Sequence, residues 1–146
     1  MKIDCNSCPI LKGVLSAFSQ GGGKFIDNGD GTVTDTRTGL MWQQETAPDK
    51  YTWEEAAKYC ETLELGSHED WRLPSIRELQ SIVDYGRYDP SIDPVFSAEL
   101  SWYWSSSSYV NFPNSAWFVD FNSGYVHYDY KYNHYYVRAV RGKGEA

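Results

Sequence analysis

The sequence contains few basic residues and no long apolar run. Its 13 Lys and Arg are outnumbered by 20 Asp and Glu among 146 residues, which gives a net charge of −7. This charge argues against DNA, RNA or an anionic membrane as a partner, because each requires a basic surface. Since no segment has secretory or membrane-spanning length, we expect a soluble, unexported chain without membrane insertion. It would lie in the cytoplasm, or join a phage particle or surface structure through a partner.

Cysteine and histidine are also scarce, with three of each. Cys5 and Cys8 form one Cys-x-x-Cys motif, which could be half a zinc site, a redox pair or a local disulfide. No second pair with ligand spacing follows, so we expect neither a metal nor another cofactor. Cys60 falls within an apolar helical pattern and is expected to be a small buried hydrophobe.

No group of residues has the arrangement of a catalytic site. The serines at 105–108 lack a recognisable base and orienting acid, and the histidines lack a Cys or acidic neighbour at a suitable spacing. We therefore expect a protein that is not an enzyme. The arginines that lie in apolar β sequence are expected to form internal ion pairs with the acidic helices, and they are Arg72, Arg138 and Arg141.

The chain divides into a short accessory segment and one domain. Residues 1–23 end in three glycines that indicate a flexible joint, and residues 24–146 are long enough to bury a core of their own. The charge is uneven, because residues 1–100 hold 17 acids and 9 bases, a net of −8, while residues 101–146 hold 3 acids and 4 bases, a net of +1. An acidic body with a near-neutral end is compatible with a protein or glycan partner.

Local patterns predict two helices and several short strands. The glycine-rich turn at 27–31 indicates a hairpin, because Gly29 and Gly31 stand where a calcium loop would need carboxylates. Capping boxes at Thr52 and Ser75 predict helices that run to Gly66 and to about Tyr85. Short β patterns follow at 103–105, 116–121, 124–128 and 135–141.

Residues 103–136 have an unusual composition. Tyr, Ser, Asn, Asp and His fill 22 of these 34 positions, with eight Tyr among them. Tyrosine offers a large rigid contact area and serine and asparagine offer adaptable hydrogen bonds, so the stretch is typical of a recognition surface. A meander of strands and turns would use the same residues, and composition alone leaves both interpretations open.

Several motifs occur along the chain in a fixed order. They are the turn Asp27–Asp35, Thr38–Trp42, Tyr59-Cys60, Asp70–Ser75, Glu78-Leu79, Tyr103–Ser107 and Val137–Gly142. Together these motifs resemble the DUF1566 family, which includes the C-terminal domain of the Legionella collagen-like adhesin. The similarity covers about residues 25–142 and implies an α+β domain with a C-type lectin fold, in which two helices pack on short, mostly antiparallel sheets with long irregular loops.

Two larger groups share that fold. Formylglycine-generating enzymes have a similar Trp-Arg-Leu-Pro segment but need late active-site thiols, and no cysteine follows Cys60 here. The variable proteins of diversity-generating retroelements acquire random changes at adenines near their C-terminus. Asn codons changed in this way give Tyr, Ser, Asp, His or Phe, so the stretch 103–136 and the ending 137–142 make the chain resemble this group.

The resemblance to sugar-binding C-type lectins is incomplete. Phe112-Pro113-Asn114 and Trp117–Asp120 stand where those lectins have their calcium-binding triplet and strand, and two ligands are missing, so calcium-dependent sugar binding is not expected. Many DUF1566 members have a cysteine where Ala139 stands, which would pair with the residue matching Cys60. That disulfide is absent here.

A variable surface on a fixed frame requires alternate positions to point in opposite directions. We expect the frame to be Trp104, Trp117, Val119, Phe121, Gly124, Val126, Val137 and Val140. We expect the open, ligand-binding face to be Phe118, Asp120, Asn122, Ser123, Tyr125, His127, Tyr128, Asp129, Tyr130, Tyr132, Asn133 and His134.

The sequence thus predicts a non-enzymatic module that binds an unknown macromolecule, and we favour a protein over a glycan. One alternative is an adhesin domain of fixed specificity for a glycan or sulfated polysaccharide. A structural subunit of a phage or surface assembly is another.

Overall fold

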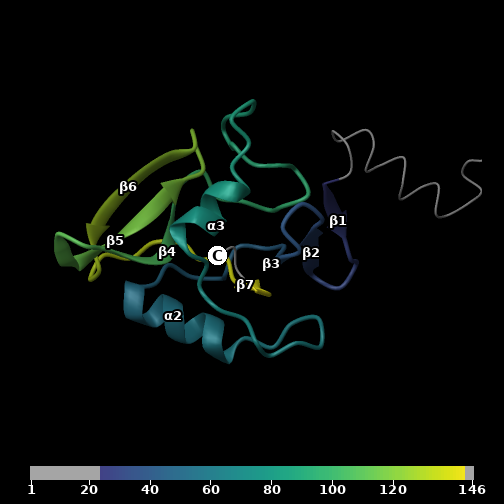
Figure 1. Ribbon diagram of the computed structural model, residues 1–146, viewed down its shortest axis with the longest axis horizontal. Helices are drawn as coiled ribbons and strands as arrows, with labels where there is room; N and C mark the ends of the chain where they lie inside the picture. The colour runs from purple at the N-terminus through teal and green to yellow at the C-terminus, as the bar shows by residue number, and fades with distance from the viewer. Residues whose placement is uncertain (1–23, 144–146) are drawn as a thin grey trace, which may run out of the picture.

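The computed structural model describes residues 24–143, which form two antiparallel sheets and two helices (Figure 1). This arrangement confirms the α+β class. The predicted accessory segment 1–23, with Cys5 and Cys8, lies outside the described residues.

The first sheet has the strand order β1-β2-β3-β7. The predicted hairpin between β1 and β2 is confirmed, and its turn uses Gly29 and Gly31 at φ values of +80° and +92°, which favour glycine. Asp30 stabilises the turn by accepting hydrogen bonds from the backbone and hydroxyl of Thr32 at 3.1 and 2.6 Å. The strands are β1 Phe25–Asp27, β2 Thr32–Asp35, β3 Met41–Gln43 and β7 Val140–Arg141.

The second sheet has the order β4-β5-β6 and consists of β4 Trp102–Tyr109, β5 Phe112–Asp120 and β6 Tyr125–Tyr130. The predicted strands at 103–105 and 116–121 were too short, because backbone pairing continues from the apolar residues into the serines and asparagines. The predicted strand at 135–141 is mostly absent. Only β7 is regular there, while Tyr135 and Tyr136 make isolated bridges to Tyr51 and Tyr103.

The helices begin where the capping boxes predict. Helix α2 spans Trp53–Thr62 and α3 spans Ile76–Ser81, and in each the N-cap hydroxyl accepts from the N3 amide while the N3 Glu accepts from the N-cap amide. Both helices end earlier than predicted. After α2, Leu65 and His68 pair across a tight turn, and after α3, Val83 pairs with the more distant Ile92.

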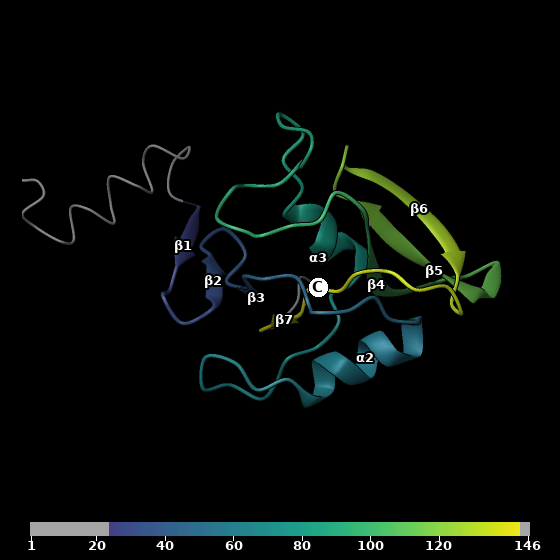
Figure 2. The ribbon, with the colours of Figure 1, turned by 180° about the vertical axis from the view of Figure 1, so that it is seen from behind.

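The core consists of two buried clusters, to which β4 and β5 both contribute. One cluster joins α3 to both sheets through residues such as Leu79, Trp42 and Val119. The other joins α2 to the second sheet and contains Cys60 and Trp104. Cys60 is buried as predicted, and burial raises the pKa of its thiol to about 12. The two helices accordingly lie on either side of β4 (Figure 2).

Arg138 is buried but does not form the predicted ion pair. Its guanidinium donates to the carbonyl oxygens of Gln43 at 2.8 Å, Gln44 at 2.6 Å and Ser97 at 2.6 Å. It also lies over the rings of Phe96 and Tyr103, 5.0 and 5.7 Å from their centres. Burial lowers the pKa of Arg138. Backbone carbonyls and aromatic rings here take the place of a carboxylate.

The other two arginines form the predicted kind of contact. Arg72 makes a bidentate ion pair with Glu78 of α3, with N–O distances of 2.7 and 2.8 Å. Arg141 pairs with Asp70 at 2.6 Å, although Asp70 lies in a loop and not in a helix.

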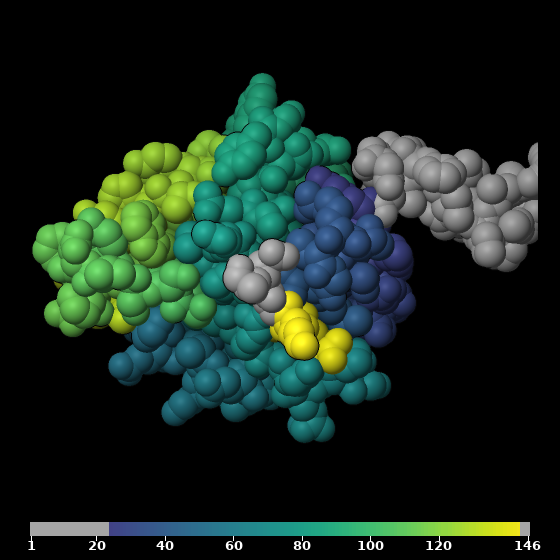
Figure 3. Space-filling model, viewed as in Figure 1, coloured from purple at the N-terminus to yellow at the C-terminus, as the bar shows by residue number. Residues whose placement is uncertain are grey.

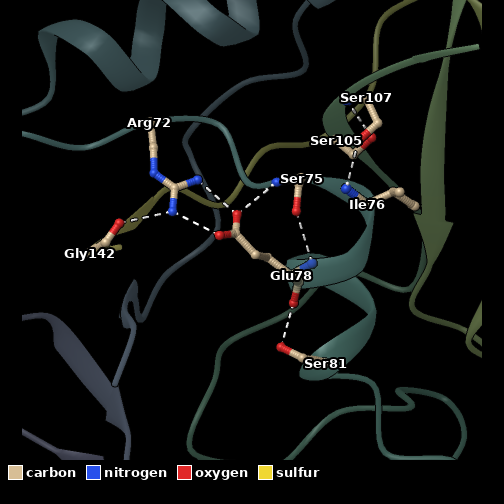
Figure 4. A network of polar contacts seen from close by, with 8 residues as sticks. All are labelled: Arg72, Ser75, Ile76, Glu78, Ser81, Ser105, Ser107 and Gly142. Atoms are coloured by element: carbon tan, nitrogen blue, oxygen red, sulfur yellow. Dashed lines mark hydrogen bonds and ion pairs between the residues drawn. The ribbon is translucent and has the colours of Figure 1, made fainter. Parts of the chain in front are cut away.

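Figure 4 shows how the Arg72–Glu78 pair continues into the strands. Arg72 also donates to the carbonyl of Gly142 at 3.0 Å, while Glu78 caps the start of α3 at Ser75. The next amide of the helix, that of Ile76, donates to the hydroxyl of Ser107 at 2.9 Å. The serines of β4 therefore attach the helix to the sheet.

Candidate functional site

Strand β6 is one edge of the second sheet and carries three exposed residues of the Tyr-rich stretch, Tyr125, His127 and Tyr130. Its neighbour β5 lies between β4 and β6 and is covered over most of its length. In the space-filling view the residues of this sheet form one side of the molecule (Figure 3). Residues of similar composition are buried in β5 and accessible in β6, because both core clusters include residues of β5 whereas only Val126 of β6 packs against one of them.

Four predicted site residues on β6 and the loop that follows it are exposed and stack in two pairs. The alternation of side chains along the strand places Tyr125 and His127 on the opposite side of it from Tyr130. Tyr125 and His127 stack with ring centres 5.7 Å apart, and Tyr130 and Tyr132 stack at 5.2 Å with nearly parallel planes. The tyrosines are 58%, 52% and 69% exposed, in sequence order. We call these four residues the tyrosine face. Stacking restricts the rings before any ligand arrives, which lowers the entropy cost of binding.

The prediction for Phe118 was wrong. Phe118 is only 2% exposed and stacks on Trp102, with ring centres 4.4 Å apart and planes 11° apart. It belongs to the buried cluster that contains Trp104 and Ala116. The alternation of β5 was read correctly, but α2 and the segment after β6 cover the face that was expected to be open.

Tyr128 belongs to a separate aromatic cluster. Its ring stacks on Tyr109 of β4 at 4.1 Å, while Trp117 meets both rings edge-on and Phe112 completes the group. Trp117 was expected in the core frame and is instead only half-buried in this cluster. Tyr128 also touches the tyrosine face, because its ring lies 4.7 Å from that of His127.

Asp129 organises the chain after β6. Its carboxylate accepts hydrogen bonds from the side-chain amide of Asn133 at 2.9 Å and from the hydroxyl of Tyr135. Burial and the neighbouring Asp129 charge raise the pKa of Tyr135, so that its hydroxyl keeps the proton it donates. Asp129 and Asn133 are half-buried, and their contacts hold the loop that presents Tyr132.

The turn between β5 and β6 carries three further predicted residues. Asp120 accepts from the amide of Asn122 at 2.8 Å, and Ser123 is exposed. The carbonyl of Asn122 accepts from the amide of Asp89, so the turn is fixed to the loop that follows α3. These residues lie at the Tyr125 end of the tyrosine face.

His134 lies apart from the other predicted residues. It lines a shallow groove of about 550 Å³ beside α2 together with Asp49, Lys50, Lys58 and the half-buried rings of Tyr51 and Tyr59. Tyr59 accepts a hydrogen bond from Gln43 at 2.8 Å, and burial raises its pKa. The structure therefore divides the predicted site and places His134 on a different surface.

The structure allows the expectations about metal binding and about the serines of β4 to be compared with residues 24–143. Residues 24–143 contain no group of three or more His, Cys, Asp or Glu that could hold a metal ion. Ser105 is buried and its hydroxyl donates to the carbonyl of Trp117 at 2.7 Å. In the same part of the chain no helix is long and apolar enough to cross a membrane.

Comparison with known families places this geometry in context. The family model described as the Lcl C-terminal domain matches residues 31–141. The chain belongs to the Lcl C-terminal domain family. This is the DUF1566 family, named for the C-terminal domain of a Legionella collagen-like protein, as the sequence motifs predict. The match spans both helices, the tyrosine face and the strands from β2 to β7. No curated protein matches the chain.

For this Lcl-type domain, sequence reasoning missed the tip of the β4–β5 hairpin. Val110 and Phe112 are 87% and 56% exposed there, beside the two-residue turn. Tyr85 and Tyr88, in the loop after α3, are also exposed. The signal for the hairpin was present, because apolar Tyr109 and Phe112 flank a turn of only two residues.

Proposed function

We propose that this Lcl-type domain is a non-enzymatic recognition module whose tyrosine face binds a protein target. The observation that carries the proposal is the set of stacked, exposed rings on an edge strand. The rest of the second sheet is packed against both helices, so the face is presented on a rigid support. Membership of the family favours an adhesin-like or other binding module.

Chemistry favours a protein surface as the target. Tyrosine, histidine and asparagine offer apolar contact area with hydrogen-bonding edges, the composition found in protein-binding surfaces that tolerate many partners. The tyrosine face carries no formal charge at neutral pH, and Lys131, the nearest cation in sequence, is held by Ser108 at 2.8 Å and lies over the ring of Trp53 at 4.0 Å. A sulfated ligand would require several free cations, which this face does not offer.

We further propose that the face is diversified by a retroelement. The division of positions supports this, since Val119 and Val137 are buried while the adenine-derived residue types Tyr125, His127 and Tyr130 lie outside. A neighbouring reverse-transcriptase gene with a near-copy of these codons, differing only at adenines, would support the proposal. Absence of such a cassette from the genome would contradict it.

We also propose that the two sheets and two helices form a C-type lectin fold. The pairing of β7 with β3 supports this, because it brings the two distant ends of the domain together in one sheet. The chain between β3 and β4, which leaves the first sheet and enters the second, corresponds to the part of that fold with long irregular loops. An experimental structure that superposes poorly on C-type lectins over both sheets would contradict the assignment.

The rival function is an adhesin domain of fixed glycan specificity. The groove beside α2 supports it, since Tyr51 and Tyr59 line a polar hollow of a size suited to small ligands. A glycan array that includes sulfated polysaccharides distinguishes the two functions. Saturable binding that is lost in Tyr59→Ala and kept in Tyr130→Ala would favour the rival.

The decisive experiment compares proteins captured from the source organism and its neighbours by wild type and by a triple variant, Tyr125→Ala, Tyr130→Ala and Tyr132→Ala. We expect one protein to be captured by wild type and lost from the variant, since a central aromatic of an interface contributes about 1–4 kcal/mol. Quantitative mass spectrometry identifies it, and titration calorimetry with the purified partner measures the loss.

The matched control is Tyr88→Ala, which removes a tyrosine that is 78% exposed but lies outside the tyrosine face. Both variants should melt within a few degrees of wild type, because exposed side chains contribute little to stability. Equal capture by the triple variant and wild type would overturn the proposal, as would a cooperative loss of folding in the triple variant.

A further inference from the structure

The backbone of β6 has an outer side that could accept another strand. In an antiparallel pair, alternate residues direct their N–H and C=O groups toward the neighbouring strand and the others direct them away. Just beyond the strand, Lys131 donates its amide to the carbonyl of Asn114 in β5 at 2.8 Å, so the odd-numbered residues face β5. Val126, Tyr128 and Tyr130 therefore direct six backbone groups, three N–H and three C=O, away from the sheet.

Neighbouring residues occupy half of these outward groups. The amide of Tyr130 donates to the carboxylate of Asp129 at 2.8 Å, and the carbonyl of Tyr130 accepts from the amide of Asn133 at 3.1 Å. The carbonyl of Tyr128 is bonded to the Nδ1 of His127 at 3.0 Å, with His127 as the donor. The C-terminal half of the edge is therefore already satisfied.

The remaining half is too short to bind a strand well. Three outward groups have no hydrogen-bond partner within residues 24–143. They are the N–H and C=O of Val126 and the N–H of Tyr128. An incoming strand could form one complete residue pair there and would then meet side chains that occupy the following groups. Proteins usually protect such edges with lysine or proline, and β6 contains neither.

We propose that His127 and Asp129 close the edge of β6 to strand addition, so that the tyrosine face binds a folded protein through side chains and not an extended peptide through its backbone. The statement about the partner rests on the proposed function. The closure of the edge does not, because it concerns only this chain. His127 thereby serves two purposes, since its ring is also part of the tyrosine face.

The test uses a double variant, His127→Phe with Asp129→Ala, and a synthetic peptide that carries the sequence of residues 124–131. Phenylalanine keeps an aromatic ring at position 127 but cannot donate to the Tyr128 carbonyl. Fluorescence polarisation measures peptide binding, and sedimentation equilibrium measures self-association. We expect both to become about tenfold tighter in the variant, since two backbone groups become free to form hydrogen bonds of ordinary strength.

The matched control is Tyr88→Ala, which removes an exposed ring outside the tyrosine face and leaves the outward backbone groups of β6 as they are. Its peptide binding and self-association should equal those of wild type. Because Asp129 also holds Tyr135, the double variant is checked by thermal melting, and His127→Phe alone replaces it if the melt is not cooperative. An increase in peptide binding of about threefold is then expected.

Peptide binding by wild type as tight as that of the variant would overturn the closure. A protein partner captured through the tyrosine face that proves to bind as an extended segment would overturn the statement about the partner. Failure of the proposed function would show differently, as no partner lost in the triple tyrosine variant while the double variant still gains peptide binding.

Discussion

Strands β5 and β6 are adjacent and similarly rich in aromatic residues, but β5 contains buried residues and β6 contains none. In β5 the ring of Phe118 is sealed against Trp102, whereas in β6 the ring of Tyr125 stands in solvent beside His127. The difference comes from packing, because both core clusters include residues of β5, whereas only Val126 of β6 packs against one of them. Composition indicates that a stretch suits recognition, and packing decides which of its residues reach the surface.

Among the substitutions that test the difference between β5 and β6, we expect the largest effect from Phe118→Ala. We expect Phe118→Ala to lower the free energy of unfolding by about 3–5 kcal/mol, since it leaves a cavity between Trp102 and Trp104. Denaturant unfolding followed by tryptophan fluorescence measures the loss. Tyr125→Ala on the adjacent strand is the control and should change stability by less than about 0.5 kcal/mol. Equal effects of the two substitutions would mean that the strands do not differ as described.

Acid should weaken the ion pair between Arg72 and Glu78, which supports the start of α3. Burial acts to raise the pKa of Glu78, but hydrogen bonds from Arg72 and Ser75 outweigh it and hold that pKa below its ordinary value. A carboxyl with a lowered folded pKa stabilises the protein above its unfolded pKa of about 4.3, and this contribution is lost as the pH falls through the folded value.

We therefore expect Glu78→Gln to cost about 2 kcal/mol at pH 7, the strength of hydrogen bonds to a charged group. The loss should shrink as the pH is lowered below about 4, because the wild-type carboxyl is then protonated as well. Unfolding curves across this pH range measure both effects. A difference between the two proteins that stays constant with pH would contradict the role of the Glu78 charge.

The smallest effect sharpens the comparison at the turn that joins the two strands. A side-chain carbon at Gly124 would lie 2.8 Å from Val83 and 2.9 Å from Tyr85, at a φ of +87°. We expect Gly124→Ala to cost about 1–3 kcal/mol, part strain and part displacement of Val83. Gly39→Ala is a matched control, since Gly39 has a φ of +78° and no neighbour within 4 Å, and its melting temperature should fall less.

Local signals in the sequence predicted the helix starts and the first hairpin, because caps and tight turns depend on a few adjacent residues. Thr52, Ser75 and Gly29 all behave in this way. The helix ends and the burial of Phe118 could not be predicted locally. They depend on partners distant in sequence, such as Ile92 for Val83 and Trp102 for Phe118.

The candidate site was predicted in composition but not in shape. Exposure of Tyr125, Tyr130 and Tyr132 is confirmed, whereas their role in binding remains a prediction. No pattern in the chain indicated that His134 turns toward α2, because that depends on how the segment after β6 crosses the helix. The closing of the strand edge by side chains also becomes visible only once the register of β5 and β6 is known.

Arg138 has a consequence for how such a domain can drift in sequence. Three of its hydrogen bonds end on main-chain oxygens, at Gln43, Gln44 and Ser97, and every amino acid supplies such an oxygen. These three hydrogen bonds therefore do not require particular side chains at positions 43, 44 and 97. A substitution at any of the three positions leaves the acceptor oxygen in place, while no other side chain matches the arginine in reach and geometry.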